Sequence, residues 1–93
     1  MKVIVGEVPL QLRFDRTQSP VFQNLGESYL WLARTPGSPV EDGLRLEPGG
    51  TLAFGGPMMA SGGPSVYVQA SARDEEEVVE ADVRVEPAPD LID

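Results

Sequence analysis

Residues 74–77 carry four consecutive carboxylates, the densest group of side chains in the sequence that could do chemistry. Carboxylate oxygens are the ligands that Ca²⁺ and Mg²⁺ prefer, so one interpretation of Asp74, Glu75, Glu76 and Glu77 is a cation site. The run lacks the ligand spacing of an EF-hand loop, which favours a solvated, charged loop instead. A third interpretation, contact with a basic surface of a partner, stays open. We expect no metal and no cofactor.

The glycine-rich segment 55–64, with the sequence GGPMMASGGP, is the second candidate. Glycine-rich loops bind phosphates when a Gly-Lys-Ser/Thr sequence closes them, but Lys2 is the only lysine of the chain. We therefore predict a surface loop. Its Met58 and Met59 are adaptable side chains that could contact a partner.

The residue types that activate nucleophiles are missing from this sequence. It contains no Cys and no His, so its serines have no His partner, and disulfides, thiolate zinc sites and Cys nucleophiles are excluded. Carboxylates are plentiful, but nothing places two of them in an apolar pocket, where their pKa values would be tuned for acid–base work. We expect no enzymatic activity and assign no catalytic residue.

Tyr29 and Trp31 are the aromatic candidates. They lie in residues 28–33, a run that is apolar on both faces and therefore predicts a strand in the middle of a sheet. In that setting the two rings favour the core or a subunit interface over a ligand groove. Exposure of Tyr29, Trp31 and Tyr67 along one groove would instead indicate a small module that binds carbohydrate or peptide.

The composition limits the size of the protein and its partners. The 93 residues predict one domain, and a hydrophobic content of 41% is enough for a core. Seven basic residues against fifteen acidic ones, a net charge of −8, argue against binding to nucleic acid or to an anionic membrane. No apolar run approaches the roughly 18 residues of a membrane span, and the N-terminus does not read as a signal peptide. We expect a complete protein made in the cytoplasm.

Nine prolines and ten glycines divide the chain into short runs in which apolar and polar residues alternate. Such runs predict an all-β fold, a small antiparallel β-sandwich or jelly-roll-like barrel of about six to eight short strands. Residues 8–86 would form the β domain. Residues 1–7 would be an N-terminal strand or an arm that pairs with a neighbour, and residues 87–93 an extended or disordered tail.

Three alternating runs supply much of the predicted core, with loops between them at residues 15–20, 34–42 and 73–77. Their apolar faces are Val8, Leu10, Leu12 and Phe14; Val66, Val68, Ala70 and Ala72; and Val79, Ala81, Val83 and Val85. Residues 75–85 are also compatible with a helix, because acidic residues favour a helix N-terminus. Valines on one alternating face favour a strand.

Residues 43–54, with the sequence GLRLEPGGTLAF, predict a hairpin that directs Leu44, Leu46, Leu52 and Phe54 to the core. Pro48 suits the second position of a type II turn because its ring fixes φ. Gly49 suits the third position because that residue needs a positive φ. We therefore assign Pro48, Gly49 and Gly50 a structural role as the turn.

Five segments occur in a distinctive order from residue 24 onward. They are Asn24-Leu25-Gly26, Tyr29-Leu30-Trp31-Leu32, residues 42–50 (DGLRLEPGG), residues 65–72 (SVYVQASA) and residues 81–85 (ADVRV). In this order they resemble a class of small structural proteins of tailed bacteriophages. The sequence departs from the class pattern at Arg34 and Thr35, where a glycine is usual, and in the unusually acidic segment 74–82. Residues 1–23 lie outside the resemblance.

The resemblance implies a jelly-roll or β-sandwich domain on the virion surface and a role in assembly. It implies a capsid decoration protein, a minor capsid protein that binds the major capsid protein on the outside of the head as a homotrimer and stabilises the shell. A head–tail connector, tail or fibre component is the alternative. The residues that we expect to contact the capsid or a neighbouring subunit are Val3, Ile4, Val5, Tyr29, Trp31, Met58 and Met59.

Overall fold

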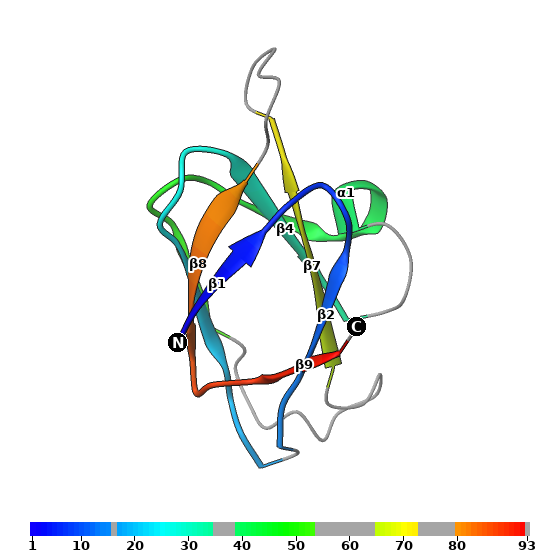
Figure 1. Ribbon diagram of the computed structural model, residues 1–93, viewed down its shortest axis with the longest axis vertical. Coiled ribbons are helices and arrows are strands. Elements are labelled where there is room, and N and C mark those ends of the chain that lie inside the picture. The colour runs from blue at the N-terminus through cyan, green and yellow to red at the C-terminus, as the bar shows by residue number, and fades with distance from the viewer. Residues whose placement is uncertain (16, 35–38, 54–64, 73–79, 93) are drawn as a thin grey trace.

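The computed structural model of the protein describes residues 1–15, 17–34, 39–53, 65–72 and 80–92 (Figure 1). These residues contain nine β-strands and one short helix, α1 (Pro39–Asp42). The strands are β1 (Lys2–Val5), β2 (Leu10–Arg13), β3 (Val21–Asn24), β4 (Tyr29–Ala33), β5 (Leu44–Leu46), β6 (Thr51–Ala53), β7 (Ser65–Ser71), β8 (Ala81–Glu86) and β9 (Asp90–Ile92).

The strands form two antiparallel sheets that enclose one core. The four-stranded sheet has the order β1-β8-β3-β6, and the five-stranded sheet has the order β5-β4-β7-β2-β9. This arrangement confirms the predicted all-β fold of a small antiparallel β-sandwich. Its described residues form nine strands, more than the roughly six to eight expected from the alternating runs.

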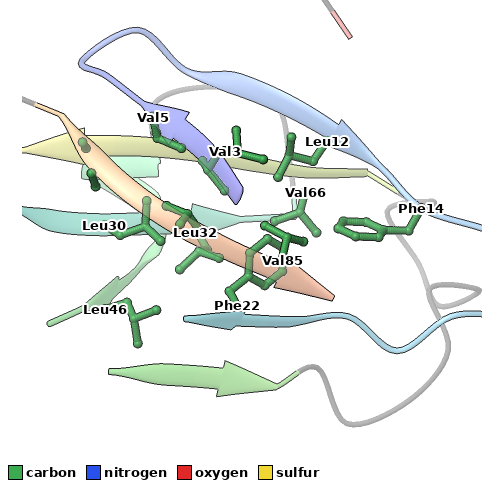
Figure 2. Close-up of a cluster of buried hydrophobic side chains, with 14 residues drawn as sticks. Val3, Val5, Leu12, Phe14, Phe22, Leu30, Leu32, Leu46, Val66 and Val85 are labelled. Carbon is green, nitrogen blue, oxygen red and sulfur yellow. The ribbon is translucent and has the colours of Figure 1, made fainter. Parts of the chain in front are cut away.

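The core lies between the two sheets, where Figure 2 shows buried side chains from both of them. Strand β8 illustrates the pattern: Ala81, Val83 and Val85 are completely buried, and the residues between them are exposed. Successive side chains of a strand point to opposite faces of a sheet, so the alternation read in the sequence becomes burial. Phe14 and Phe22 meet edge to face at 5.8 Å between ring centroids, a favourable geometry for two aromatic rings.

Most of the predicted core faces are confirmed. Buried residues from the predicted runs are Leu12, Phe14, Leu30, Leu32, Val66, Val68, Ala70, Ala81, Val83 and Val85. Val8 is instead 78% exposed, because β2 begins only at Leu10. Of residues 75–85, which were also compatible with a helix, residues 81–85 lie in strand β8, and residues 75–79, including Val79, lie outside the described residues.

Residues 1–7 were expected to be a strand or an arm, and they contain an edge strand of the four-stranded sheet. Strand β1 pairs with β8 along its whole length, with Lys2 opposite Arg84 and Val5 opposite Ala81. Val3 and Val5 are 6% and 1% exposed and belong to the core, so neither offers its side chain to a partner. Ile4, at 65% exposed, is the member of the predicted trio that faces outward.

The C-terminal segment also belongs to the sandwich. Residues 87–93 were expected to be an extended or disordered tail, but β9 within them pairs with β2, placing Asp90 opposite Arg13. Strand β9 lies at the edge of the five-stranded sheet and crosses the lower half of the molecule in Figure 1. Alternation is hard to detect in three residues, which is why the sequence pattern did not indicate this strand.

The predicted hairpin at residues 43–54 is wrong, because its two strands belong to different sheets. Strand β5 pairs with β4 in the five-stranded sheet, whereas β6 pairs with β3 in the four-stranded sheet. The segment therefore links the two layers. Leu46 is buried, but Leu44 is 63% exposed at the sheet edge, and Phe54 lies outside the described residues.

The turn inside this link has the predicted type and explains why no hairpin forms. The Gly50 N–H donates a hydrogen bond to the Glu47 carbonyl at 2.8 Å, and Gly49 has a φ of +81°. With Pro48 before it, this glycine completes a type II turn. Turns of types I and II splay their flanking strands, whereas tight hairpins use the mirror-image types.

Gly49→Val is expected to lower the free energy of unfolding by about 1–2 kcal/mol, because a β-branched residue resists a positive φ. A Cβ at Gly49 would meet no atom within 4 Å, so the cost is one of backbone conformation alone. Urea denaturation followed by tryptophan fluorescence measures it. Gly49→Asn is the matched control and should retain most of the stability, since Asn tolerates this conformation. Wild-type stability of the valine variant would contradict a type II turn.

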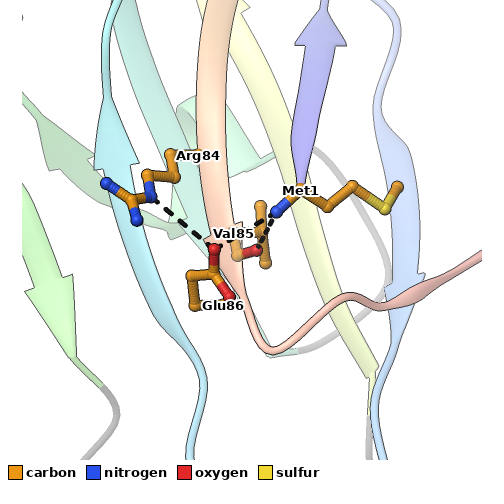
Figure 3. A network of polar contacts seen from close by, with 4 residues as sticks. All are labelled: Met1, Arg84, Val85 and Glu86. Atoms are coloured by element: carbon orange, nitrogen blue, oxygen red, sulfur yellow. Dashed lines mark hydrogen bonds and ion pairs between the residues drawn. The ribbon is translucent and has the colours of Figure 1, made fainter.

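Polar contacts hold the start of β1 against the end of β8 (Figure 3). The Met1 ammonium donates to the Val85 carbonyl at 3.0 Å and lies 3.4 Å from Glu86 Oε1. The same oxygen lies 3.7 Å from Arg84 Nε. The side chains of Arg84 and Glu86 are each 58% exposed, so water and salt screen the two ion pairs and weaken them.

Glu86→Gln is expected to change the free energy of unfolding by less than about 0.5 kcal/mol, the usual scale of an exposed ion pair. The variant keeps the hydrogen bond from Met1 to the Val85 carbonyl, which continues the β1–β8 ladder. Thermal denaturation at low and high salt measures the difference between variant and wild type. A loss above about 1 kcal/mol that disappears in high salt would show that the carboxylate anchors β1.

Candidate functional site

An aromatic group lies on the outer face of the five-stranded sheet. Leu30 and Leu32 of β4 point into the core, so Tyr29 and Trp31 of the same strand point outward, and both are half-buried. Arg45 of the neighbouring strand β5 pairs with Trp31 and shares this face. We call Tyr29, Trp31 and Arg45 the aromatic cluster.

Direct contacts orient each side chain of the aromatic cluster. The Trp31 indole N–H donates a hydrogen bond to Ser71 Oγ on β7 at 2.8 Å. The guanidinium carbon of Arg45 lies 4.6 Å from the centroid of the Tyr29 ring and 5.9 Å from that of Trp31. Arg45 Nη2 also lies 2.9 Å from Glu47 Oε1. A cation over ring faces with a carboxylate beside it is a favourable arrangement, and because the ion pair is exposed, water and salt weaken it.

Gln69 of β7 connects the aromatic cluster to its surroundings. It pairs with Trp31 across the sheet. Its Oε1 accepts a hydrogen bond from the Val40 N–H of α1 at 3.4 Å, and its Nε2 donates to the Glu7 carbonyl at 2.6 Å. Gln69 therefore attaches both the helix and the β1–β2 connection to the outer face of the sheet. Predicting residues 34–42 as a loop missed this helix, although Pro39 at its first position is a recognised start signal.

The border of the aromatic cluster is acidic. The helix brings the exposed Glu41, the β1–β2 connection brings the exposed Glu7, and Glu47 beside Arg45 is 57% exposed at its side chain. The outer face of the four-stranded sheet differs. Its central strand β8 presents both signs of charge at Asp82 and Arg84, and none of the described residues that point outward there is aromatic.

The residues predicted as contacts do not form one patch. Tyr29 and Trp31 lie in the aromatic cluster and not in the core, whereas the exposed Ile4 lies on the outer face of the other sheet. Met58, Met59 and the acidic run at residues 74–77 lie outside the described residues. Sequence reasoning missed Arg45, although its place between Leu44 and Leu46 in an alternating run indicated an outward side chain.

Asp15 lies in a local hydrogen-bonded turn with Thr17 and Gln18. The N–H and the hydroxyl of Thr17 donate hydrogen bonds to the Asp15 carboxylate, and these bonds lower the pKa of Asp15. This turn is an exposed local structure that also involves Gln18. In the part of the chain that is described, no three potential ligand side chains gather into a metal site. No helix there is long and apolar enough to cross a membrane.

Asn24 joins segments that are far apart in the sequence. Its buried side-chain amide donates to the carbonyls of Ser28 at 2.8 Å and Leu46 at 3.1 Å, and its Oδ1 accepts from the Gly26 N–H at 3.0 Å. Its backbone also exchanges hydrogen bonds with the type II turn, accepting from Gly49 and donating to Gly50. We call this set of contacts the Asn24 junction.

The closing strand meets the same junction. The Leu25 N–H donates to the Asp82 carbonyl at 2.7 Å. A Cβ on Gly26 would lie 3.0 Å from Ala81 Cα, so this glycine permits the close approach of β8. The N-L-G, E-P-G-G and A-D-V-R-V segments are therefore neighbours in space, and the glycines of the first two have a structural reason.

Comparison with models of protein families, with curated proteins and with solved structures found no match to this protein.

Proposed function

We propose that this protein is a non-enzymatic structural protein of a tailed-phage virion. As a capsid decoration protein it binds the major capsid protein on the outer surface of the head shell, as a homotrimer, and stabilises that shell. In the infected cell it is made in the cytoplasm and then joins the virion.

The Asn24 junction is the observation that carries this proposal. The segments whose order resembles the phage class are far apart in the chain, yet Asn24 and Leu25 bond both to the type II turn and to β8. A shared sequence pattern is informative when its residues hold one fold together, because each then has a physical reason to be there. The two-sheet β-sandwich is also the fold that the resemblance implies.

Co-sedimentation with empty head shells tests the proposal. The shells come from the phage whose genome encodes this chain, and the purified protein is added over a range of concentrations. We expect saturable binding, with a copy number in proportion to the shell subunits, and shells that resist heating better. Light scattering of the free protein should give the mass of a trimer. No binding to any virion component would overturn the proposal, and a copy number matching the portal ring would favour a connector or tail component.

A second function, binding of carbohydrate or peptide, is favoured by one observation. Tyr29, Trp31 and Tyr67 all project from the outer face of the same sheet and are all half-buried. Titrating the protein with neutral oligosaccharides and proline-rich peptides, with Trp31 fluorescence as the signal, tests it. A saturable change in emission would support this function, and unchanged emission with every probe would remove it.

A further inference from the structure

We infer that the aromatic cluster is the docking surface of this protein and that it fits a shell protein patch with an apolar centre and a basic border. The inference rests on the proposed function, which it extends by naming the contact residues and the chemistry of the partner. The centre of the surface, its border and its contrast with the opposite sheet each support this inference.

The centre has the composition and rigidity of a binding hot spot. Trp, Tyr and Arg are the residue types that dominate the energy of protein interfaces. Here Trp31 is bonded to Ser71, and Arg45 is held between the Tyr29 ring and Glu47. Side chains that are already ordered lose little conformational entropy when a partner binds.

Arg45 keeps hydrogen-bonding capacity for a partner. Its side chain is 47% exposed, and the ion pair with Glu47 uses its Nη2. A guanidinium has five N–H donors, so several remain to bond backbone carbonyls or a carboxylate of the partner. The partner patch should therefore offer an acceptor at its centre, surrounded by apolar groups that cover the rings.

The charges at the border of the cluster indicate the charge of a complementary partner. Exposed Glu47 lies beside Arg45, and exposed Glu7 and Glu41 belong to the two segments that Gln69 bonds, so a patch with Lys or Arg at its edge is complementary. A second copy of this chain would bring its own acidic border into contact with the first. Its net charge of −8 adds a general repulsion between copies. The charges therefore favour a basic shell surface over self-association through this face.

The opposite face of the sandwich supplies a control surface. On the four-stranded sheet Ile4 is 65% exposed, and Asp82 and Arg84 alternate in charge around it. An isolated exposed apolar residue among mixed charges is ordinary surface. Substitutions there should leave binding to the shell unchanged.

Binding isotherms of variants on empty shells test the centre. Trp31→Ala and Arg45→Ala should each raise the apparent Kd by at least about tenfold, and Trp31→Phe by less, because the ring is retained. Ile4→Ala, on the other sheet, should stay within about threefold of wild type. Circular dichroism and denaturation show whether each variant is folded. If Trp31→Ala does not fold, Arg45→Ala still tests the surface, because Arg45 is half-exposed and its truncation should leave the fold intact.

Charge variants test the border. Glu7→Gln combined with Glu41→Gln should weaken binding at low salt and flatten its dependence on salt concentration, because the variant has fewer charges to be screened. Asp82→Asn on the opposite face is the matched control and should leave the salt dependence as in wild type. Tighter binding of the double variant would mean that the shell patch is not basic.

The outcomes separate this inference from the proposed function. Shells that bind wild type but also bind Trp31→Ala and Arg45→Ala equally well would overturn the docking surface alone. If the wild-type protein is an oligomer and Trp31→Ala dissociates it, the aromatic cluster lies between copies of this chain. That result would also overturn the docking surface. Shells that do not bind the wild-type protein would overturn the proposed function and this inference together.

Discussion

Asn24→Asp is expected to lower the free energy of unfolding by about 3–5 kcal/mol at neutral pH, the scale of a broken buried polar network. The wild-type amide donates to the carbonyls of Ser28 and Leu46, and Asn24 is completely buried. The substituted carboxylate would direct a negatively charged oxygen at both carbonyls and leave them without a donor. The bond from Gly26 to Oδ1 would survive, so the loss concerns the donor side.

The loss should depend on pH with a definite sign. Burial and the two facing carbonyls would raise the pKa of the new carboxyl in the folded state above its unfolded value. The folded variant then binds its proton more tightly than the unfolded chain. The deficit is therefore greatest above the folded pKa, shrinks as the pH falls through it, and levels off below the unfolded pKa.

Urea denaturation of wild type and variant across this pH range measures both effects. Gln23→Glu is the matched control, since it makes the same amide-to-carboxylate change one residue earlier on the opposite face of β3, where the side chain is half-exposed. It should change stability by less than about 0.5 kcal/mol. Equal losses in the two variants would mean that the Asn24 junction contributes no more than a surface amide.

Gly43→Ala is expected to cost about 3 kcal/mol or more, because the added methyl group has no room. A Cβ there would lie 2.5 Å from the Leu32 carbonyl oxygen and 2.6 Å from the Pro39 carbonyl oxygen. Both are backbone atoms, so neither can rotate away as a flexible side chain would. The Gly43 N–H also donates to the Pro39 carbonyl at 2.7 Å, which closes the single turn of α1 just before β5 begins.

Thermal and urea denaturation of Gly43→Ala measure this cost against Gly49→Ala. The control adds the same methyl group where no atom lies within 4 Å, so its loss in the free energy of unfolding comes only from the positive φ and is about 1 kcal/mol. Gly43 does not have a positive φ, so the excess of its loss over that of the control is a lower bound on the steric contribution. Similar losses in both would show that α1 and β4 move apart easily, which would also weaken the support that the helix gives to the aromatic cluster.

Local alternation in the sequence predicted strands and their buried faces well. The inward faces of β7 and β8 follow from residues that alternate within one strand, and burial of Val68 or Val83 needs no knowledge of distant partners. The type II turn at Gly49 was predictable for the same reason, since its conformation depends on Pro48 and the glycine itself.

Pairing between distant segments was not predictable in this way. Alternation shows that β5 and β6 each have an apolar face, but not that the faces belong to different sheets. A type II turn tends to splay its flanking strands, which is a local signal against the hairpin that the alternation predicts. Asn24 is a comparable case, because one of its acceptors, the Leu46 carbonyl, lies 22 residues away.

Only part of the candidate site was predictable from the sequence. Tyr29 and Trp31 were named from their residue types, but the apolar character of both faces of β4 suggested that both would be covered. Nothing local to a strand reveals whether a second layer of structure covers its outer face. Arg45 and Gln69 became meaningful only through cross-strand pairing with Trp31, which the sequence does not display.

The position of β8 between β1 and β3 has a consequence for how the molecule folds. The two outer strands of this trio are early in the chain, and the strand that joins them is late, so Met1 bonds to a residue 84 positions away. The four-stranded layer cannot assemble gradually as the chain emerges from the ribosome. It forms only after β8 has been synthesised, and closing the long loop between β1 and β8 costs conformational entropy. This topology is typical of slowly folding β domains. Until then β1 and β3 expose unpaired edges, and this nascent stage is when the chain is most vulnerable to aggregation.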